Sequence, residues 1–197
     1  MTKRLFDFFF SLLMLLLLGG ILLICILIAS IDTKSFGLFI QSRIGQHGIP
    51  FNIFKVKTLS DSSKVITPFG RFLRSSKLDE LPQLLNVLVG TMSFVGPRPD
   101  IAGYADKLVG DDKIVLLVKP GITGLASLKY RNEEELLSRL PDPLLYNDTI
   151  IWPDKVRINK WYVMNRNLLL DLKILYCTLL PIKIDVDCFI KKRKCKS

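Results

Sequence analysis

The chain has 197 residues, a formal net charge of +10 and a mean hydropathy of +0.34. This length suits one domain with a modest core, because two full domains would each bury too little apolar surface. The positive charge requires an anionic partner, which could be a phospholipid surface, a phosphorylated substrate or nucleic acid. Four cysteines without C-x-x-C spacing argue against a zinc site or a disulfide framework and favour a reducing, cytoplasmic setting: Cys25, Cys177, Cys188 and Cys195.

The first element is an apolar segment from Phe8 to Ile31, which has 24 residues and no charged side chain. As a helix it would be about 36 Å long, enough to cross a hydrocarbon core of about 30 Å. A cleaved signal peptide is the alternative, but its apolar region is usually about 7–15 residues long and ends at a small-x-small site. Neither feature is present, so we predict membrane insertion.

The path of this segment through the bilayer is a separate question. Basic residues lie on both sides of it, so the positive-inside rule places both flanks on the cytoplasmic side. Gly19-Gly20 divides it into halves of about 16 Å, so that one half can reach the midplane and the other can return. We predict a re-entrant membrane helix over residues 1–34, broken near residues 19–20, with a spanning helix as the alternative. Asp7 follows Arg4 by three residues, and we expect the two to pair because a lone carboxylate at that depth is costly.

The segments that follow mix strand and helix signals. Gly37 to Thr58 reads as two β-rich stretches around a glycine-rich turn, which predicts a hairpin with His47 solvated in the turn. Thr67 to Arg74 opens a helix with proline at its first position, and Asp79 to Leu88 has apolar residues at 81, 84, 85 and 88, the spacing of an amphipathic helix. Further helices are predicted at residues 111–118, from Asn132, and at residues 167–180. We therefore predict an α+β fold, mainly helical, with a short β-hairpin and interfacial helices.

Two segments near the C-terminus each leave two interpretations open. Residues 167–180 are rich in Leu and Ile and could lie along a membrane surface or pack on the core. The basic tail, residues 191–197, holds five basic side chains. It could draw the protein to anionic lipid, at about 1 kcal/mol per side chain near the surface, or it could be a solvated tail.

Residues suited to phosphate chemistry gather between Gly70 and Asp100. Arg71 and Arg74 precede the acidic pair Asp79-Glu80, and the stiff loop Gly96-Pro97-Arg98-Pro99 follows it. Carboxylates can hold a metal ion or attack phosphorus, and a guanidinium matches a phosphate or diphosphate. The acidic pair is predicted at the start of a helix, where carboxylates that merely cap the helix would also be favoured. The proline-rich loop favours chemistry over capping.

At these residues the sequence resembles the bacterial sugar transferases, or monotopic polyprenyl-phosphate phosphoglycosyl transferases. The strongest part of the resemblance is LDELPQLLNVLVGTMSFVGPRP, Leu78 to Pro99, which is too long to match by chance. Shorter matching pieces extend the resemblance over nearly the whole chain: KRLFD at Lys3–Asp7, FKVKT at Phe54–Thr58, KPGITG at Lys119–Gly124 and LLLDLKIL at Leu168–Leu175.

The resemblance implies transfer of a sugar phosphate from a UDP-sugar to undecaprenyl phosphate with release of UMP. This would be the first membrane step of a surface glycan pathway, such as lipopolysaccharide or capsule biosynthesis. It implies Asp79 as the nucleophile of a covalent aspartyl intermediate, and Asp79 with Glu80 as the Mg²⁺ site. The residues it makes candidates for binding phosphate or substrate are Lys57, Arg74, Pro97, Arg98 and Asp171, of which Asp171 could instead serve the structure.

The resemblance also implies where the protein works. The catalytic domain, residues 35–190, would lie on the cytoplasmic face of the bacterial inner membrane. Membrane lipid would be a partner and nucleic acid would not, and a homodimer is a candidate assembly.

The sequence departs from the family pattern at three places. Gly19-Gly20 stands where many relatives carry Ser-Pro, and GLASLKYRN, Gly124 to Asn132, stands where relatives often read GWAQVNGRN. Asn159 stands where relatives often have aspartate before the Tyr-Val pair. These departures leave Asp79-Glu80 intact and leave the identity of the sugar open.

Two other functions compete with this one. Asp185-Val186-Asp187 could be the D-x-D metal motif of a glycosyltransferase, but no nucleotide-binding α/β unit precedes it. A basic membrane adaptor without catalysis would explain the charge and the anchor, but not the Arg, Asp-Glu and Pro-Arg-Pro constellation. Aromatic and basic residues do not alternate as in proteins that stack nucleic-acid bases.

Overall fold

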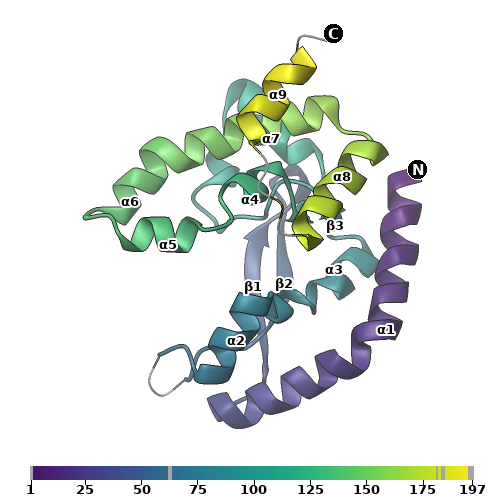
Figure 1. Cartoon of the computed structure of the whole chain (residues 1–197), viewed down its shortest axis with the longest axis vertical. Helices are drawn as coiled ribbons and strands as arrows, with labels where there is room; N and C mark the ends of the chain where they lie inside the picture. The colour runs from purple at the N-terminus through teal and green to yellow at the C-terminus, as the bar shows by residue number, and fades with distance from the viewer. Residues whose placement is uncertain (1, 62–63, 181, 183–184, 195–197) are drawn as a thin grey trace. The chain divides into compact units, whose positions relative to one another are not determined.

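A computed structural model describes residues 2–61, 64–180, 182 and 185–194 (Figure 1). The chain forms two compact units. Unit 1 comprises Met1–Gly45 and Ile49–Ser93, and unit 2 comprises Gln46–Gly48 and Phe94–Ser197. The fold is α+β and mainly helical, as predicted from the sequence. The predicted boundaries between residues 34 and 35 and between 190 and 191 stay predictions.

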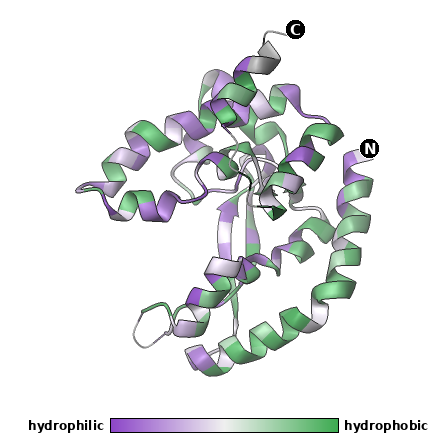
Figure 2. Ribbon diagram, viewed as in Figure 1, coloured by the Kyte–Doolittle hydropathy of each residue, from purple (hydrophilic) through white to green (hydrophobic). Residues whose placement is uncertain are grey.

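Helix α1, Thr2–Thr33, is apolar over most of its length (Figure 2). It is one continuous helix across Gly19 and Gly20, and Figure 1 shows that its axis bends about midway. Many of its apolar side chains are exposed, Leu16 by 75% and Ile31 by 81%. Within the described ranges it is the one helix long and apolar enough to cross a membrane. Such exposure is typical of a helix in contact with lipid, and the re-entrant path stays a prediction.

The predicted β-hairpin is confirmed. Strands β1, Leu38–Ile44, and β2, Pro50–Val56, pair antiparallel, with Leu38 opposite Val56 and Ile44 opposite Pro50. The connection contains the 3-10 turn η1, Gln46–Gly48, in which His47 is exposed with a φ of 60°.

Helix α2, Pro68–Ser76, also confirms a prediction. Proline occupies its first turn, and the Thr67 side chain accepts a hydrogen bond from the Gly70 N–H at 2.9 Å. This is the arrangement expected of a helix that begins after a threonine cap.

The helix predicted over Asp79–Leu88 is wrong at its start. The acidic pair lies in a separate 3-10 turn, η2 (Leu78–Glu80), and helix α3 is Gln83–Val89. The reason is Pro82, which has no N–H to donate to the Leu78 carbonyl in the first helical bond. The Leu81 N–H donates to that carbonyl instead, at 3.2 Å. The predicted apolar face is also shifted, because Leu85 is 40% exposed whereas polar Asn86 is buried.

The core of unit 1 is formed by α1, β2 and α2, and the η2 turn packs against it. Leu22, Cys25 and Ala29 of α1 form a buried cluster with Val56 and Leu73, and partly buried Leu78 and Leu81 pack against it. The Asn86 side chain joins α3 to β2, since it accepts from the Phe54 N–H at 3.2 Å and donates to the Asn52 carbonyl at 2.7 Å.

Unit 2 contains most of the helices. Strands β3 (Ser93–Val95) and β4 (Gly121–Thr123) form a second two-stranded sheet. The helical elements described in unit 2 are the 3-10 turns η3 (Ala105–Lys107) and η4 (Gly110–Leu117), the π-helical turn η5 (Asn147–Ile151), and α4 (Leu125–Lys129), α5 (Glu133–Ser138), α6 (Pro143–Tyr146), α7 (Trp152–Asn165), α8 (Leu168–Leu179) and α9 (Val186–Lys194).

Three helical predictions are met in unit 2, one with a different helix type. The stretch predicted at 111–118 is the 3-10 turn η4, and Asn132 is the cap residue of α5. Helix α8 packs on the core through Leu170 and Ile174, while Leu169 and Leu179 on its other side are exposed. Of the predicted basic tail, residues 191–194 continue α9, and residues 195–197 lie outside the described residues.

Candidate active site

Asp79 has the features of a reactive carboxylate. Its side chain is 8% exposed, and Oδ1 is buried without a hydrogen-bond partner in the part of the chain that the structure describes. A buried polar atom of this kind is costly unless a ligand or ion satisfies it. The atom is therefore suited to contact a substrate or a metal ion.

The chain before Asp79 turns sharply. Lys77 ends α2 and begins η2 with a φ of 60°, a left-handed conformation that is uncommon for a residue with a side chain. Leu78 and Leu81 flank the acidic pair and pack into the core cluster. These apolar contacts hold the turn on the core of unit 1, which fixes Asp79 in its buried position.

Glu80 is paired across unit 1 with a residue that the sequence analysis did not select. Lys55 Nζ lies 3.4 Å from Glu80 Oε1, and both side chains are largely buried. Lys55 lies near the end of β2, and the predicted Lys57 follows the last residue of that strand. The alternation within FKVKT was the signal that could have identified Lys55 together with Lys57.

Two of the predicted cations lie on elements near this turn. Arg74 Nε donates to Thr58 Oγ1 at 3.0 Å. Helix α2 can approach Thr58 this closely only because residue 70 is glycine, since a Cβ there would lie 2.3 Å from the Thr58 carbonyl oxygen. Lys57 Nζ pairs with Asp61 Oδ2 at 2.6 Å. Unit 1 therefore brings Asp79 and Glu80 together with Lys55 and Arg74, while the ammonium of Lys57 is engaged by a partner of its own.

The charges around Asp79 oppose one another. Burial raises the pKa of its carboxyl group above the ordinary value, and the negative charge of Glu80 raises it further. The nearby charges of Lys55, Lys77 and Arg74 act in the opposite direction and lower it. A buried carboxylate with a perturbed pKa and specific charged neighbours is typical of functional sites.

A divalent cation fits this pair only with help from other ligands. No group of three or more His, Cys, Asp or Glu side chains that could hold a metal occurs among the described residues. Mg²⁺ is commonly held by one or two carboxylates together with water and substrate phosphates. Asp79 Oδ1, which has no hydrogen-bond partner among the described residues, and the neighbouring Glu80 carboxylate match that requirement.

The predicted Gly-Pro-Arg-Pro loop lies in unit 2. Its prolines, Pro97 and Pro99, are buried, and Arg98 between them is exposed and donates to the Ile122 carbonyl at 3.4 Å. The loop runs against residues 119–124, where a Cβ on Gly121 would lie 2.1 Å from the Gly96 nitrogen. Glycine is thus required for this backbone contact, which stiffens the loop and holds Arg98 at the surface.

Asp171 has a structural contact. It is 3% exposed, lies in α8 and accepts a hydrogen bond from the Tyr162 hydroxyl of α7 at 2.6 Å. This joins the two helices, and a role for Asp171 in binding substrate stays a prediction.

The D-x-D residues are engaged in other contacts. Asp185 Oδ1 accepts from the Cys188 N–H at 2.9 Å and so caps α9. Asp187 pairs with Lys129 at 2.6 Å and with Arg157. Asp154 completes this cluster, at 2.7 Å from both cations. Carboxylates neutralised in this way are poorly placed to bind a metal ion.

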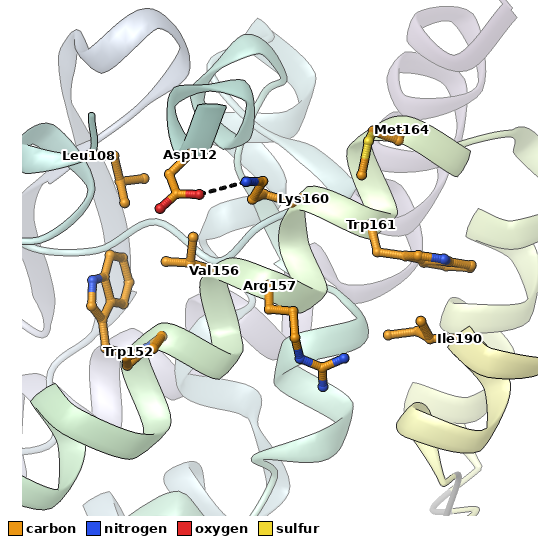
Figure 3. Close-up of a pocket in the computed structure, with 10 residues that line it drawn as sticks. Leu108, Asp112, Trp152, Val156, Arg157, Lys160, Trp161, Met164 and Ile190 are labelled. Carbon is orange, nitrogen blue, oxygen red and sulfur yellow. Dashed lines mark hydrogen bonds and ion pairs between the residues drawn. The ribbon is translucent and has the colours of Figure 1, made fainter. Parts of the chain in front are cut away.

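A hollow of about 460 Å³ in unit 2 contains none of the predicted site residues (Figure 3). It follows α7 between Trp152 and Trp161 and is mostly apolar. Its two cations already have partners, since Lys160 pairs with Asp112 at 2.8 Å and Arg157 belongs to the ion-pair cluster. The hollow therefore offers no ready site for an anion.

Comparisons with known proteins show which family the chain resembles. Residues 1–183 match the sequence model of the family described as bacterial sugar transferase. One relative, the uncharacterized sugar transferase EpsL of Bacillus subtilis, is 35% identical over 188 residues, which cover 90% of this chain and 85% of that protein.

Two further relatives have names that state a reaction. The UDP-glucose:undecaprenyl-phosphate glucose-1-phosphate transferase of Klebsiella pneumoniae is 35% identical over 192 residues, 89% of this chain and 39% of that protein. The undecaprenyl-phosphate galactose phosphotransferase of Salmonella typhimurium is 31% identical over 165 residues, 70% of this chain and 31% of that protein. The chain thus spans less than half the length of these two relatives.

Proposed function

We propose a reaction for this chain, which belongs to the bacterial sugar transferase family: transfer of a sugar 1-phosphate from a UDP-sugar to undecaprenyl phosphate. The products are undecaprenyl-diphosphate-sugar and UMP. The observation that carries the proposal is the buried Asp79 carboxylate, whose Oδ1 has no partner in the described structure, beside Glu80 and Lys55.

The first step is an attack by an Asp79 carboxylate oxygen on the phosphorus atom that bears the sugar. A bond forms between that oxygen and phosphorus while the bond to the bridging oxygen of the diphosphate breaks, and UMP leaves with that oxygen. In the second step a phosphate oxygen of undecaprenyl phosphate attacks the same phosphorus, and the Asp79 carboxylate is restored. No oxidant, reductant or net proton is needed.

Mg²⁺ bound by Asp79, Glu80 and the diphosphate would neutralise charge on the leaving group. The residues of the chain do the remaining work. Lys55 orients Glu80 through their ion pair and favours the ionised form of Asp79. Arg74 and Lys57 are the proposed phosphate-binding cations of unit 1, and Arg98, held at the surface by Pro97 and Pro99, is that of unit 2.

Membrane association supports a lipid substrate. Helix α1 presents apolar side chains that require hydrocarbon, and α8 exposes Leu169, Tyr176 and Leu179 on one side. We propose that this side of α8 lies on the bilayer surface and that the catalytic site faces the cytoplasm of the bacterial inner membrane. The pathway would be the first membrane step in making a surface glycan such as lipopolysaccharide or capsule.

The proposal is tested with detergent-solubilised protein, a panel of UDP-sugars, undecaprenyl phosphate and Mg²⁺. We expect UMP to be released with at least one donor. Release of more than one UMP per protein molecule should require the lipid phosphate. Release of UDP would instead indicate a glycosyltransferase of the D-x-D type. Absence of nucleotide release with every donor would leave a membrane adaptor without catalysis.

A further inference from the structure

The first turn of α1 contacts the helix that follows the carboxylate pair. Arg4 donates from Nη1 to the Val87 carbonyl and from Nη2 to the Leu88 carbonyl, each at 2.6 Å. Both carbonyls lie in the last turn of α3, where the N–H donors four residues further along the helix are missing. The Val87 carbonyl also accepts from the Gly90 N–H at 3.1 Å. The forked guanidinium can reach two neighbouring carbonyls at once, and its charge complements the negative end of the helix.

Burial shows that this contact belongs to a defined face of α1. Asp7 and Ser11, three and seven residues after Arg4, are 3% and 0% exposed, and Val87 on α3 is 0% exposed. Positions at this spacing lie along one side of a helix. A polar stripe on an otherwise apolar helix is expected to face protein rather than lipid. The stripe therefore sets which side of α1 packs on α3, and Figure 1 shows the first half of α1 running beside that helix.

Helix α3 is connected to the carboxylate pair from two directions. Along the chain, the Leu84 N–H donates to the Leu81 carbonyl at 3.0 Å, which links the start of α3 to the end of the η2 turn. Across the unit, Asn86 bonds to β2, and Lys55 of β2 pairs with Glu80. A displacement of α3 would therefore move the turn that carries Asp79 and Glu80.

We propose that Arg4 is a positioning residue for Asp79 and Glu80. By bridging the Val87 and Leu88 carbonyls it fixes α3, and with it the η2 turn, against the membrane helix. Helix α1 is then part of the framework of the active site as well as its anchor. This inference rests on the proposed function, because positioning is defined by what it does to the transfer reaction.

The decisive variant is Arg4→Lys. It keeps the positive charge that governs membrane topology, but one ammonium group cannot reproduce the forked contact with both carbonyls. We expect kcat to fall about 10-fold or more with KM for the UDP-sugar within about twofold, because a small misplacement of catalytic groups is costly.

Lys3→Arg is the matched control, since it also exchanges one basic side chain for another beside Arg4 and should leave kcat and the membrane-bound fraction unchanged. A kcat of Arg4→Lys equal to that of the wild type would overturn the inference. A loss of activity that only parallels a loss of membrane-bound protein would also overturn it, because Arg4 would then be an anchor alone.

Hydrogen exchange over residues 78–89 is a readout that does not depend on turnover. Faster exchange in Arg4→Lys than in Lys3→Arg is the expected result, and equal exchange would contradict the proposed contact. Absence of UMP release by the wild type would refute the proposed function, and the exchange experiment would still decide whether Arg4 holds the turn.

Discussion

Asp79 occupies its position at a cost to the stability of the fold. Its pKa is raised, chiefly by burial, relative to an ordinary aspartate. A carboxyl group whose pKa is higher in the folded state contributes stability below its unfolded pKa, and this contribution is lost as pH rises through the folded pKa. At neutral pH the charge therefore opposes folding, which is the compromise expected of a group retained for chemistry.

Asp79→Asn tests this compromise. The substitution removes the attacking charge with little change in size, so turnover should be lost while the membrane-bound fraction is unchanged. In the absence of substrate the melting temperature at neutral pH should rise by about 2–4 °C, the change that corresponds to about 1 kcal/mol in a chain of this size. Thermal unfolding in detergent measures it. A lower melting temperature would mean that the Asp79 charge has a stabilising partner and is a structural group.

Lys55→Met tests the electrostatic role of the Lys55–Glu80 pair. The positive charge of Lys55 lowers the pKa of Asp79, so its removal should raise that pKa. Because attack requires the ionised carboxylate, the acidic limb of the kcat profile should move to higher pH. Lys57→Met is the control for the electrostatic effect, since the Lys57 ammonium pairs with Asp61. As a proposed phosphate-binding cation Lys57 can affect substrate binding, but the position of the limb should not change. An unmoved limb in Lys55→Met would remove Lys55 from the site.

At the scale of elements, the sequence predicted the helices and strands whose conformation depends on neighbouring residues in the chain. The hairpin and the start of α2 follow from turn glycines, a threonine cap and a proline. The helix expected at Asp79 was misjudged because Pro82 outweighs the apolar spacing around it. Helix α7 was not predicted, since its buried positions Val156, Ile158 and Trp161 do not form a simple helical stripe. Tertiary contacts such as that of Trp161 with Phe189 determine it instead.

The ion-pair cluster gives α9 a testable role. Hydrogen bonds from Lys129 and Arg157 lower the pKa of the Asp187 carboxyl group. The stability that ionised Asp187 contributes is therefore present at neutral pH and is lost as the pH falls below the ordinary aspartate range. Asp187→Asn should therefore speed amide exchange in residues 186–191 at neutral pH. The metal dependence of turnover should not change. Loss of metal dependence in this variant would restore the D-x-D interpretation. Asp185→Asn changes the other aspartate of that motif and should likewise leave the metal dependence unchanged.

At the scale of the whole molecule, the sequence could predict the family and the apolar N-terminal helix, because each depends on a contiguous segment, and the role of the acidic pair stays a prediction. The sequence could not predict which distant groups meet those segments. The predicted pairing of Arg4 with Asp7 stays a prediction, and nothing in the sequence indicated that the Arg4 guanidinium also bonds to α3, more than eighty residues away. Lys55 was missed for the same reason, because its partner Glu80 is 25 residues away and only folding brings them together.

The transfer reaction itself depends on one covalent step at Asp79. Intact-protein mass spectrometry after incubation with a UDP-sugar and Mg²⁺, without lipid phosphate, tests that step most directly. We predict a mass increase of one sugar phosphate, located on Asp79 by peptide mapping, absent from Asp79→Asn and discharged when undecaprenyl phosphate is added. The same adduct on Asp79→Asn, or UMP release by that variant at the wild-type rate, would contradict the account.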